Sequence, residues 1–280
     1  MLESAIDLLL RAKKKGYAIC AFNFHNLEIL QAILETAETE KAPVILQITP
    51  TYLEKIGATA AAAMARDAAT AVKVPVALHL DHSESLNWII WALAHGFTSI
   101  MVDGSKLPLQ ENIALSTQAA YAAHSVGASS EAEIGSIGGV EDSVETSNAC
   151  NGLADPYQAL KLVEETGIDT LAPALGTAHG MYTSTPNIDF ERLEKIRTLI
   201  QVPLVLHGGS GIPDAMIKES IAKGITKVNI GTELKVAWAK SMSATIIRET
   251  EPWKAALEVR QAVAKVVKHK LYLCDSIGKA

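Results

Sequence analysis

Three histidines each follow a short apolar run that gives way to small or polar residues. His82 lies in the segment LHLDHS, His179 in GTAHG and His207 in LVLHGGSG. Any one of them alone would more often be structural, but all three come where a predicted strand ends, which is where barrel enzymes carry their chemistry. Three histidine ligands with an open fourth position form a catalytic zinc site. We therefore predict that the three histidines converge on one metal ion, with Asp81 working beside it.

Carboxylates follow or lie on two further predicted strands. Asp103 ends the run MVDG, whereas Glu131 and Glu133 alternate along one strand and point to the same side of the sheet. Buried acids are costly unless they are paired, hydrogen-bonded or bound to a cation. Two interpretations stay open: the acids orient the histidines, or Asp103 and Glu133 form a second or alternative metal position.

Two stretches that contain glycine follow the predicted seventh and eighth strands, where barrels often hold a phosphate group. They read GGSG at 208–211 and NIGT at 229–232. Glycine lets backbone N–H groups approach an oxyanion, and hydroxyl groups add donors. Because Gly208 directly follows His207, a phosphate here would lie near the metal. The expected substrate is a small phosphate ester that binds both.

A metal beside a phosphate site restricts the possible reactions. It could polarise a carbonyl and stabilise an enediolate, as in aldol or isomerase chemistry, or it could activate water for hydrolysis. A Schiff-base mechanism needs a lysine that points into the barrel. Lys227 is the one lysine on a predicted strand. It begins the eighth strand, so we expect it at the opposite end of the barrel.

The elements that position these groups alternate along the chain as short apolar runs and longer helical patterns, which predicts a (β/α)8 TIM barrel. Ser83 is expected to cap a helix that starts near Glu84. The long loops 135–154 and 177–187 are candidate lids. Two helices, 235–249 and 255–270, follow the barrel, and the second is a candidate oligomer arm. Strands are predicted at 18–22, 44–48, 76–80, 99–102, 129–133, 170–174, 204–206 and 227–230.

Length and composition fit one domain that spans residues 1–280, with 49% apolar residues and a net charge of −6. There is no basic run, so nucleic acid is not an expected partner. The cysteines, Cys20, Cys150 and Cys274, are widely spaced and contain no CxxC motif, which suits a reducing compartment. The N-terminus predicts an amphipathic helix rather than a signal peptide. No apolar run reaches the roughly 20 residues that span a bilayer. We expect a cytoplasmic protein that does not bind membranes.

Several segments together resemble the class II, zinc-dependent ketose-bisphosphate aldolases. The resemblance runs from Gly16 to Lys270 and is most similar to the tagatose-1,6-bisphosphate branch, which is related to the class II fructose-1,6-bisphosphate aldolases. It implies reversible cleavage of a ketose 1,6-bisphosphate to dihydroxyacetone phosphate and glyceraldehyde 3-phosphate. The segments are LHLDHS, MVDGS, EAEIGSIGG, GTAHGMY, LVLHGGSG and VNIGTEL.

The resemblance also implies individual roles. His82, His179 and His207 match the zinc ligands, and Asp81 matches the acid that exchanges a proton with the aldehyde oxygen. Glu141 matches a loop glutamate that moves the proton at the triose carbon. Asp103 and Glu133 match a second or vacated metal position, and Asn23 matches a residue near the bound triose. Arg260 matches an arginine that reaches the distal phosphate of a neighbouring subunit. The phosphate and monovalent-cation (Na⁺ or K⁺) region matches Gly180, Gly208, Gly209, Ser210, Asn229, Ile230, Gly231 and Thr232.

Two departures bear on the substrate. Many fructose-type relatives have a lysine shortly after the second histidine ligand, where this chain has Met181, Tyr182 and Thr183, which favours the tagatose branch. Gly231 stands where relatives carry a larger residue, so contacts with the triose could be looser. The alternatives are a fructose-bisphosphate aldolase, a class II aldolase for another ketose 1-phosphate, and a metal-dependent sugar-phosphate phosphatase or isomerase. A homodimer or homotetramer is expected, and a further alternative is a subunit that needs an accessory chain for activity.

Overall fold

The computed structural model describes residues 2–141, 144–146 and 152–280 of the chain, although side chains are described only outside 140–151. Eight parallel strands form a closed barrel in the order β1-β11-β10-β8-β5-β4-β3-β2, which confirms the predicted TIM barrel. The barrel strands are β1 (Ile19–Asn23), β2 (Val44–Ile48), β3 (Val76–Ser83), β4 (Ser99–Val102), β5 (Ser129–Ile134), β8 (Thr170–Pro173), β10 (Leu204–Leu206) and β11 (Ile225–Ile230).

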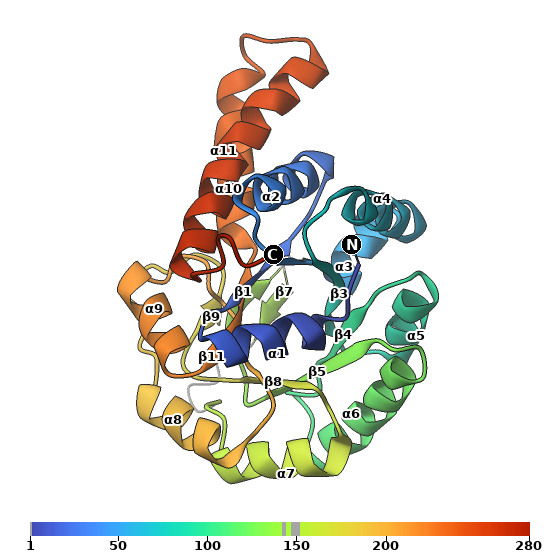
Figure 1. The fold of residues 1–280 in the computed structure, drawn as a ribbon, viewed down its shortest axis with the longest axis vertical. Coiled ribbons are helices and arrows are strands. Elements are labelled where there is room, and N and C mark those ends of the chain that lie inside the picture. Colours follow the sequence, from blue (N-terminus) through green and yellow to red (C-terminus); the bar gives the residue numbers. More distant parts are fainter. Residues whose placement is uncertain (1, 142–143, 147–151) are drawn as a thin grey trace.

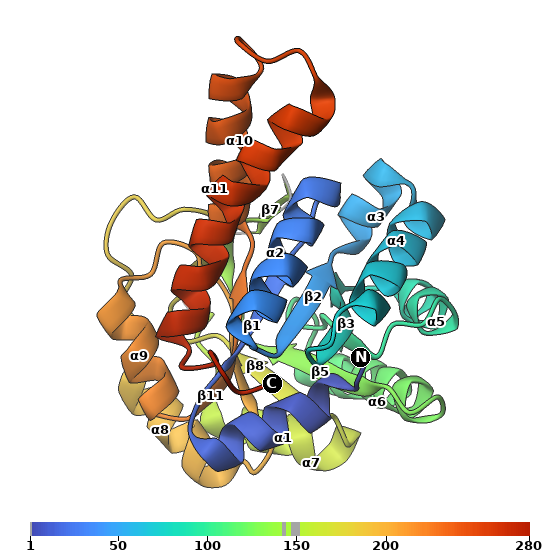
Figure 2. The same ribbon diagram turned by 45° about the horizontal axis from the view of Figure 1, so that its top comes forward.

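Helices surround the barrel, and the last two extend beyond it as a hairpin that projects from one side (Figure 1). Figure 2 shows α2 lying beside the lower part of this hairpin. No helix in the described part of the chain is long and apolar enough to cross a membrane. The surrounding helices are α2 (Leu27–Glu40), α3 (Pro50–Ile56), α4 (Ala58–Ala71), α5 (Leu86–Ala94), α6 (Leu109–His124), α7 (Pro156–Thr166), α8 (Phe190–Leu199) and α9 (Asp214–Ala222), and the hairpin is formed by α10 (Thr232–Thr245) and α11 (Pro252–Leu273).

The two faces of the barrel strands differ in chemistry, because side chains alternate along a strand. On β3, Leu78 and Leu80 belong to the apolar layer between strands and helices. His79 and Asp81, on the other face, are fully buried polar residues. Gln47, Glu131 and other polar side chains are also buried on neighbouring strands. Buried polar groups need partners, so the barrel interior is the candidate location of a functional site.

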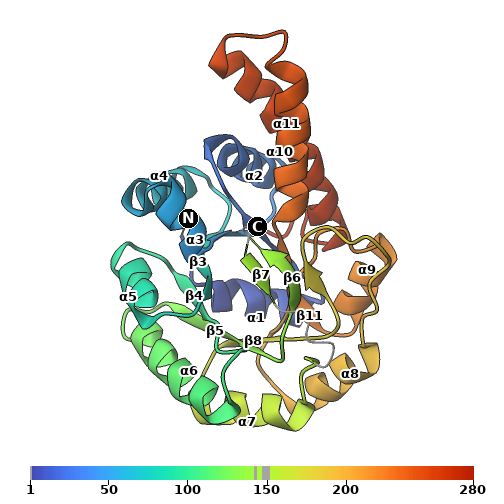
Figure 3. The same cartoon turned by 180° about the vertical axis from the view of Figure 1, so that it is seen from behind.

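The two ends of the barrel are covered differently. α1 (Ala5–Lys15) packs its apolar face on Ile19, Ile45 and Ala77 at the amino-terminal end of the strands. A hairpin of β6 (Gly138–Glu141) and β7 (Val144–Thr146) lies over the opposite end, with α1 behind it in Figure 3. β6 also pairs with the short β9 (Ala178–His179). The two segments predicted to be long loops therefore meet in a small sheet above the carboxyl ends of the barrel strands.

Two local predictions are wrong. Ser83 does not cap the next helix: it belongs to β3, and the side chain of Ser85 instead accepts a hydrogen bond from the N–H of Asn87 at the start of α5. Lys227 is not at the far end of the barrel. Strand β11 begins two residues earlier than predicted, at Ile225, so Lys227 lies inside its span and its side chain is fully buried.

Candidate metal centre and phosphate pocket

A bulge at the end of β3 turns His82 towards the barrel axis. The pairing register between β3 and β4 shifts between Leu80 and Ser83. Within that interval His82 has a φ of 47°, in the left-handed region that residues with a β-carbon rarely adopt. Such bulges re-aim side chains next to active sites, and strained backbone persists only where the surroundings hold it.

The three predicted histidines come together. One ring nitrogen from each of His82, His179 and His207 lies within 4.8 Å of the other two. The closest pair is His82 Nε2 and His207 Nδ1, which are 2.9 Å apart. The ring of His179 lies edge-on to that of His82, with centroids separated by 4.8 Å. The histidines come from the ends of β3, β9 and β10, so residues far apart in sequence form one cluster.

Carboxylates hold the outer nitrogens of two of these rings. His82 Nδ1 is 2.9 Å from Asp103 Oδ2, and His207 Nε2 is 2.9 Å from Glu131 Oε1. If each outer nitrogen donates to its carboxylate, both inner nitrogens carry lone pairs and face each other. A cation between the two nitrogens would be bound by both lone pairs, which otherwise repel each other. Histidines oriented by carboxylates are usual around bound metals. The donor set therefore fits a metal ion held by His82, His179 and His207.

Burial and charge favour the protonation states that such a site needs. Burial lowers the pKa of His207, although its hydrogen bond with Glu131 opposes the change. Burial alone would raise the pKa of Glu131, but the Lys227 ammonium, the hydrogen bond from His207 and the nearby His79 together outweigh it and hold the pKa well below its usual range. Burial would likewise raise the pKa of Asp103, but its interaction with His82 and its hydrogen bonds from Ser105 together lower it. A neutral imidazole between ionised carboxylates is the form that binds metal.

Asp103 and Glu133 bear on the second predicted metal position. His82, Asp103 and Glu133 also form a group with ligand atoms within 4.8 Å of one another. Glu133 Oε2 is 3.9 Å from the Nδ1 atoms of both His82 and His207. Asp103 Oδ1 accepts hydrogen bonds from the N–H and hydroxyl of Ser105 at 3.1 and 2.6 Å. Orientation of the histidines and direct metal binding both remain compatible with this geometry.

Asp81 lies beside the histidines among amide groups. Its Oδ2 accepts from Asn23 Nδ2 at 2.9 Å and from Gln47 Nε2 at 3.0 Å. Its Oδ1 accepts from Asn229 Nδ2 at 3.3 Å. These amides come from β1, β2 and β11, and Gln47 also donates to Asn23 Oδ1 at 2.8 Å. Four strands thus hold one carboxylate in a fixed position, as a proton-transfer group requires.

A small pocket beside the histidines collects most of the residues predicted to bind phosphate. A β-carbon on Gly208, which has a φ of 69°, would lie 2.4 Å from the carbonyl oxygen of Ala178, so glycine is needed there. Ser210 Oγ accepts from the N–H groups of Gly231 and Glu233 at 3.3 Å each, which ties the loop after β10 to the start of α10. The lining residues are Asn23, His25, His179, Gly180, Gly208, Ser210, Asn229, Gly231, Thr232 and Lys235.

Three residues of this region were not predicted. Lys235, one turn into α10, lines the pocket, and its Nζ is 5.9 Å from the centre of the Tyr52 ring. His25 also lines the pocket and packs against the same ring. The hydroxyl of Tyr182 accepts from the N–H of Ala178 at 2.8 Å and donates to the carbonyl of Gly208 at 2.9 Å. Burial raises the pKa of Tyr182 to about 12, so this link persists at neutral pH.

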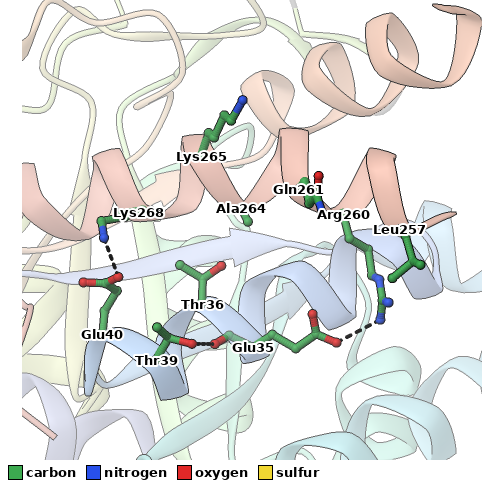
Figure 4. A pocket seen from close by; sticks show the side chains of 10 residues that line it. All are labelled: Glu35, Thr36, Thr39, Glu40, Leu257, Arg260, Gln261, Ala264, Lys265 and Lys268. Carbon is green, nitrogen blue, oxygen red and sulfur yellow. Dashed lines mark hydrogen bonds and ion pairs between the residues drawn. The ribbon is translucent and has the colours of Figure 1, made fainter. Parts of the chain in front are cut away.

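Four predicted residues lie elsewhere or cannot be placed. The Ile230 side chain packs in the apolar core, and Gly209 supports the loop by donating its N–H to the Asn229 carbonyl at 2.9 Å. Arg260 lies on α11 and contacts Glu35 Oε1 at 2.8 Å, in an outer groove of about 530 Å³ between α2 and α11 (Figure 4). Glu141 ends β6, but its side chain lies outside the described part of the structure.

A parallel barrel with a candidate metal centre next to a glycine-lined pocket defines the class of protein: a TIM-barrel enzyme. The chain belongs to the class II fructose-bisphosphate aldolase family, whose model matches residues 3–279. It is therefore a class II aldolase, a carbon–carbon lyase, from a family that acts on phosphorylated sugars. This confirms the resemblance seen in the sequence.

Solved structures agree with this assignment. The YdjI aldolase from Escherichia coli K12 is 35% identical over 100% of both chains, with a TM-score of 0.89. A Coccidioides immitis protein described as a fructose-1,6-bisphosphate aldolase is 32% identical over 98% of this chain and 97% of that one, with a TM-score of 0.92. The fructose-bisphosphate aldolase of Campylobacter jejuni is 23% identical over 100% of this chain and 97% of that one. Its TM-score of 0.83 shows that it shares the fold.

Proposed function

We propose that this aldolase catalyses the reversible cleavage of a ketose 1,6-bisphosphate, with tagatose 1,6-bisphosphate the favoured substrate, to dihydroxyacetone phosphate and glyceraldehyde 3-phosphate. The observation that carries the proposal is the convergence of His82 Nε2 and His207 Nδ1, 2.9 Å apart, beside a pocket suited to phosphate. Zinc is the proposed metal because three imidazoles are typical of catalytic zinc sites. Zinc would supply Lewis-acid polarisation of the ketose carbonyl.

The proposed proton transfers belong to the chain's own residues. During cleavage, Asp81 takes the proton from the hydroxyl that becomes the aldehyde oxygen, and it returns that proton during condensation. Its three amide donors hold it in place for this transfer. Glu141 is proposed, from the family resemblance, to exchange the proton at the triose carbon. Asp103 and Glu133 either orient the histidines or receive a displaced metal ion.

The phosphate of the triose is proposed to bind in the pocket formed by Gly180, Gly208, Ser210, Gly231 and Thr232. Lys235 would place a positive charge at this pocket, which compensates for the absence of a lysine shortly after His179. Asn229 Oδ1 is buried and has no hydrogen-bond partner among the described residues, so it offers an acceptor to a ligand hydroxyl or to a monovalent cation such as Na⁺ or K⁺. Gly209 and Ile230 would contribute through the backbone only.

The distal phosphate is proposed to involve a second copy of the chain. Arg260 projects from α11 outside the barrel, so a role in phosphate binding would be towards a neighbouring subunit. The tip of the α10–α11 hairpin exposes Ile246, Ile247 and Trp253, which supports association into a homodimer or homotetramer. We also propose that residues 1–280 form one domain and that the enzyme is cytoplasmic. A need for an accessory subunit stays an alternative.

The substrate proposal is tested by assaying cleavage of tagatose 1,6-bisphosphate and fructose 1,6-bisphosphate side by side, with identification of the products. A higher kcat/KM for the tagatose compound supports the proposal. A preference for fructose 1,6-bisphosphate would instead identify the enzyme as a fructose-bisphosphate aldolase. Release of inorganic phosphate without triose products would contradict aldol chemistry. Activity that appears only after a second polypeptide is added would favour the alternative of a subunit that needs an accessory chain, whereas full activity of the purified chain alone would count against it.

A further inference from the structure

A fully buried polar network lies beneath the candidate metal centre, on the inner face of the barrel. The Lys227 ammonium donates to Glu131 Oε2 at 2.7 Å and to His79 Nε2 at 3.4 Å. The side chains of Lys227 and Glu131 are 0% and 2% exposed. On the other side of the carboxylate, Glu131 Oε1 meets His207 Nε2 at 2.9 Å. One carboxylate therefore connects the lysine to a proposed metal ligand.

The direction of each hydrogen bond follows from the chemistry of the groups. An ammonium can only donate, so His79 Nε2 is an acceptor and the ring proton is on Nδ1. That proton is donated to Ser99 Oγ at 2.7 Å, and Ser99 Oγ also accepts from Ser129 Oγ at 3.1 Å. Burial and the adjacent Lys227 charge lower the pKa of His79 to about 3, so the ring is neutral. His79 thus fixes the ammonium without adding a second charge.

Glu131 in turn has a defined orientation. Its Oε2 is held by Lys227 and, at 3.3 Å, by the hydroxyl of Thr170, which leaves Oε1 for His207. Because Oε1 accepts from Nε2–H, the His207 ring turns Nδ1 towards His82 and His179. Without the Lys227 ammonium, the buried Glu131 carboxylate would carry an uncompensated charge, which costs folding free energy, and its orientation would no longer be fixed. The position of the His207 ring therefore depends on Lys227, which acts through Glu131.

We propose that Lys227 is a positioning residue for the metal centre: held by His79, it orients Glu131, which fixes the ring of His207 with Nδ1 facing the metal. The inference rests on the proposed metal site. It assigns Lys227 a role other than that of a Schiff-base nucleophile, since its side chain is buried and ion-paired. Loss of such outer partners weakens metal binding by about 10- to 100-fold in other proteins, which sets the expected effect.

The test measures metal binding without substrate. The zinc affinity of the purified chain is determined by competition with a chromophoric chelator, and the Co²⁺ form is examined by visible absorption. We expect Lys227→Met to weaken zinc binding about 10- to 100-fold and to change the Co²⁺ spectrum. Lys270→Met is the matched control, because Lys270 is also buried and ion-paired, 2.7 Å from Glu233 Oε1, away from this network. It should lower the melting temperature while the zinc affinity and the Co²⁺ spectrum remain unchanged.

A second variant keeps the test informative if Lys227→Met does not fold. Lys227→Met combined with Glu131→Gln removes both charges, retains an acceptor for His207, and should fold yet bind zinc more weakly than the wild type. Wild-type affinity and an unchanged Co²⁺ spectrum in either folded variant would overturn the inference. A wild-type chain that binds no metal at the three histidines would overturn the proposed metal site as well, which separates that failure from this one.

Discussion

Replacing Asp81 with asparagine is the sharpest perturbation of the proposed proton transfer. Asparagine has almost the same shape but cannot accept a proton at neutral pH. General acid–base catalysis contributes about 10²- to 10⁴-fold, which corresponds to about 3–5 kcal/mol of activation free energy. We therefore expect Asp81→Asn to lower kcat for carbon–carbon cleavage by at least about 10²-fold.

The effect on stability follows from the hydrogen bonds. Asn23 and Gln47 donate to one oxygen of Asp81, and Asn229 donates to the other at the longer distance of 3.3 Å. An asparagine that keeps its oxygen towards the first two amides turns its NH2 group towards Asn229. One buried donor then loses its acceptor, which costs about 1–3 kcal/mol of unfolding free energy.

The assay combines three measurements on the wild type and Asp81→Asn: steady-state cleavage, zinc content per chain and urea unfolding. Zinc content should be unchanged, because the groups that hold the Asp81 carboxylate are the amides of Asn23, Gln47 and Asn229 rather than the proposed metal. A variant that holds zinc, is folded and turns over at nearly the wild-type rate would refute the role of Asp81. A variant that loses zinc together with activity would show instead that Asp81 supports the metal centre.

Three further predictions concern groups around the site. His207→Ala should lose zinc and cleavage activity together, and a zinc-replete, active variant would remove His207 from the ligand set. Lys235→Met should raise the KM for the bisphosphate about tenfold, because it removes one charge-assisted contact. The control is Lys55→Met, since the Nζ of Lys55 also lies near Tyr52, 5.7 Å from the ring centre. An equal rise in KM in both variants would contradict a specific role of Lys235. The pKa of His79 falls from 6.5 to about 3 on folding, so the unfolded chain binds more protons between these values. The unfolding free energy should therefore decrease as pH falls, by about 2 kcal/mol from this group between pH 6.5 and 5, and His79→Gln should reduce that slope in urea titrations. An identical slope in the two proteins would argue against a neutral His79.

Much of the site was predictable because barrel topology brings strand ends together. Residues that follow apolar runs, such as His82 and His207, meet at the carboxyl end of a parallel barrel wherever they lie in sequence. The alternation of Leu78, His79, Leu80 and Asp81 likewise separates an outward apolar face from an inward polar one. Strand periodicity therefore determines both the layer in which a side chain lies and the end of the barrel it approaches.

The features that were missed depend on register and on contacts between distant segments. A shift of two residues at the start of β11 moves Lys227 from the far end of the barrel into the network beneath His207. Lys235 lies on a helix face, where sequence periodicity does not distinguish a pocket-lining lysine from a solvated one. The pairing of β6 with β9 joins two segments that each resemble a loop in isolation. The positive φ of His82 arises from a bulge that no local residue preference indicates.

Metal dependence of aldol cleavage tests the central claim most directly. Cleavage of the preferred ketose bisphosphate is measured on the protein as purified, after complete removal of metal with a chelator, and after stoichiometric zinc is restored. Activity should disappear on chelation and return with one zinc ion per chain, and His82→Ala should not recover. Cleavage that survives full chelation, with zinc absent by elemental analysis, would contradict a metal centre formed by the three histidines.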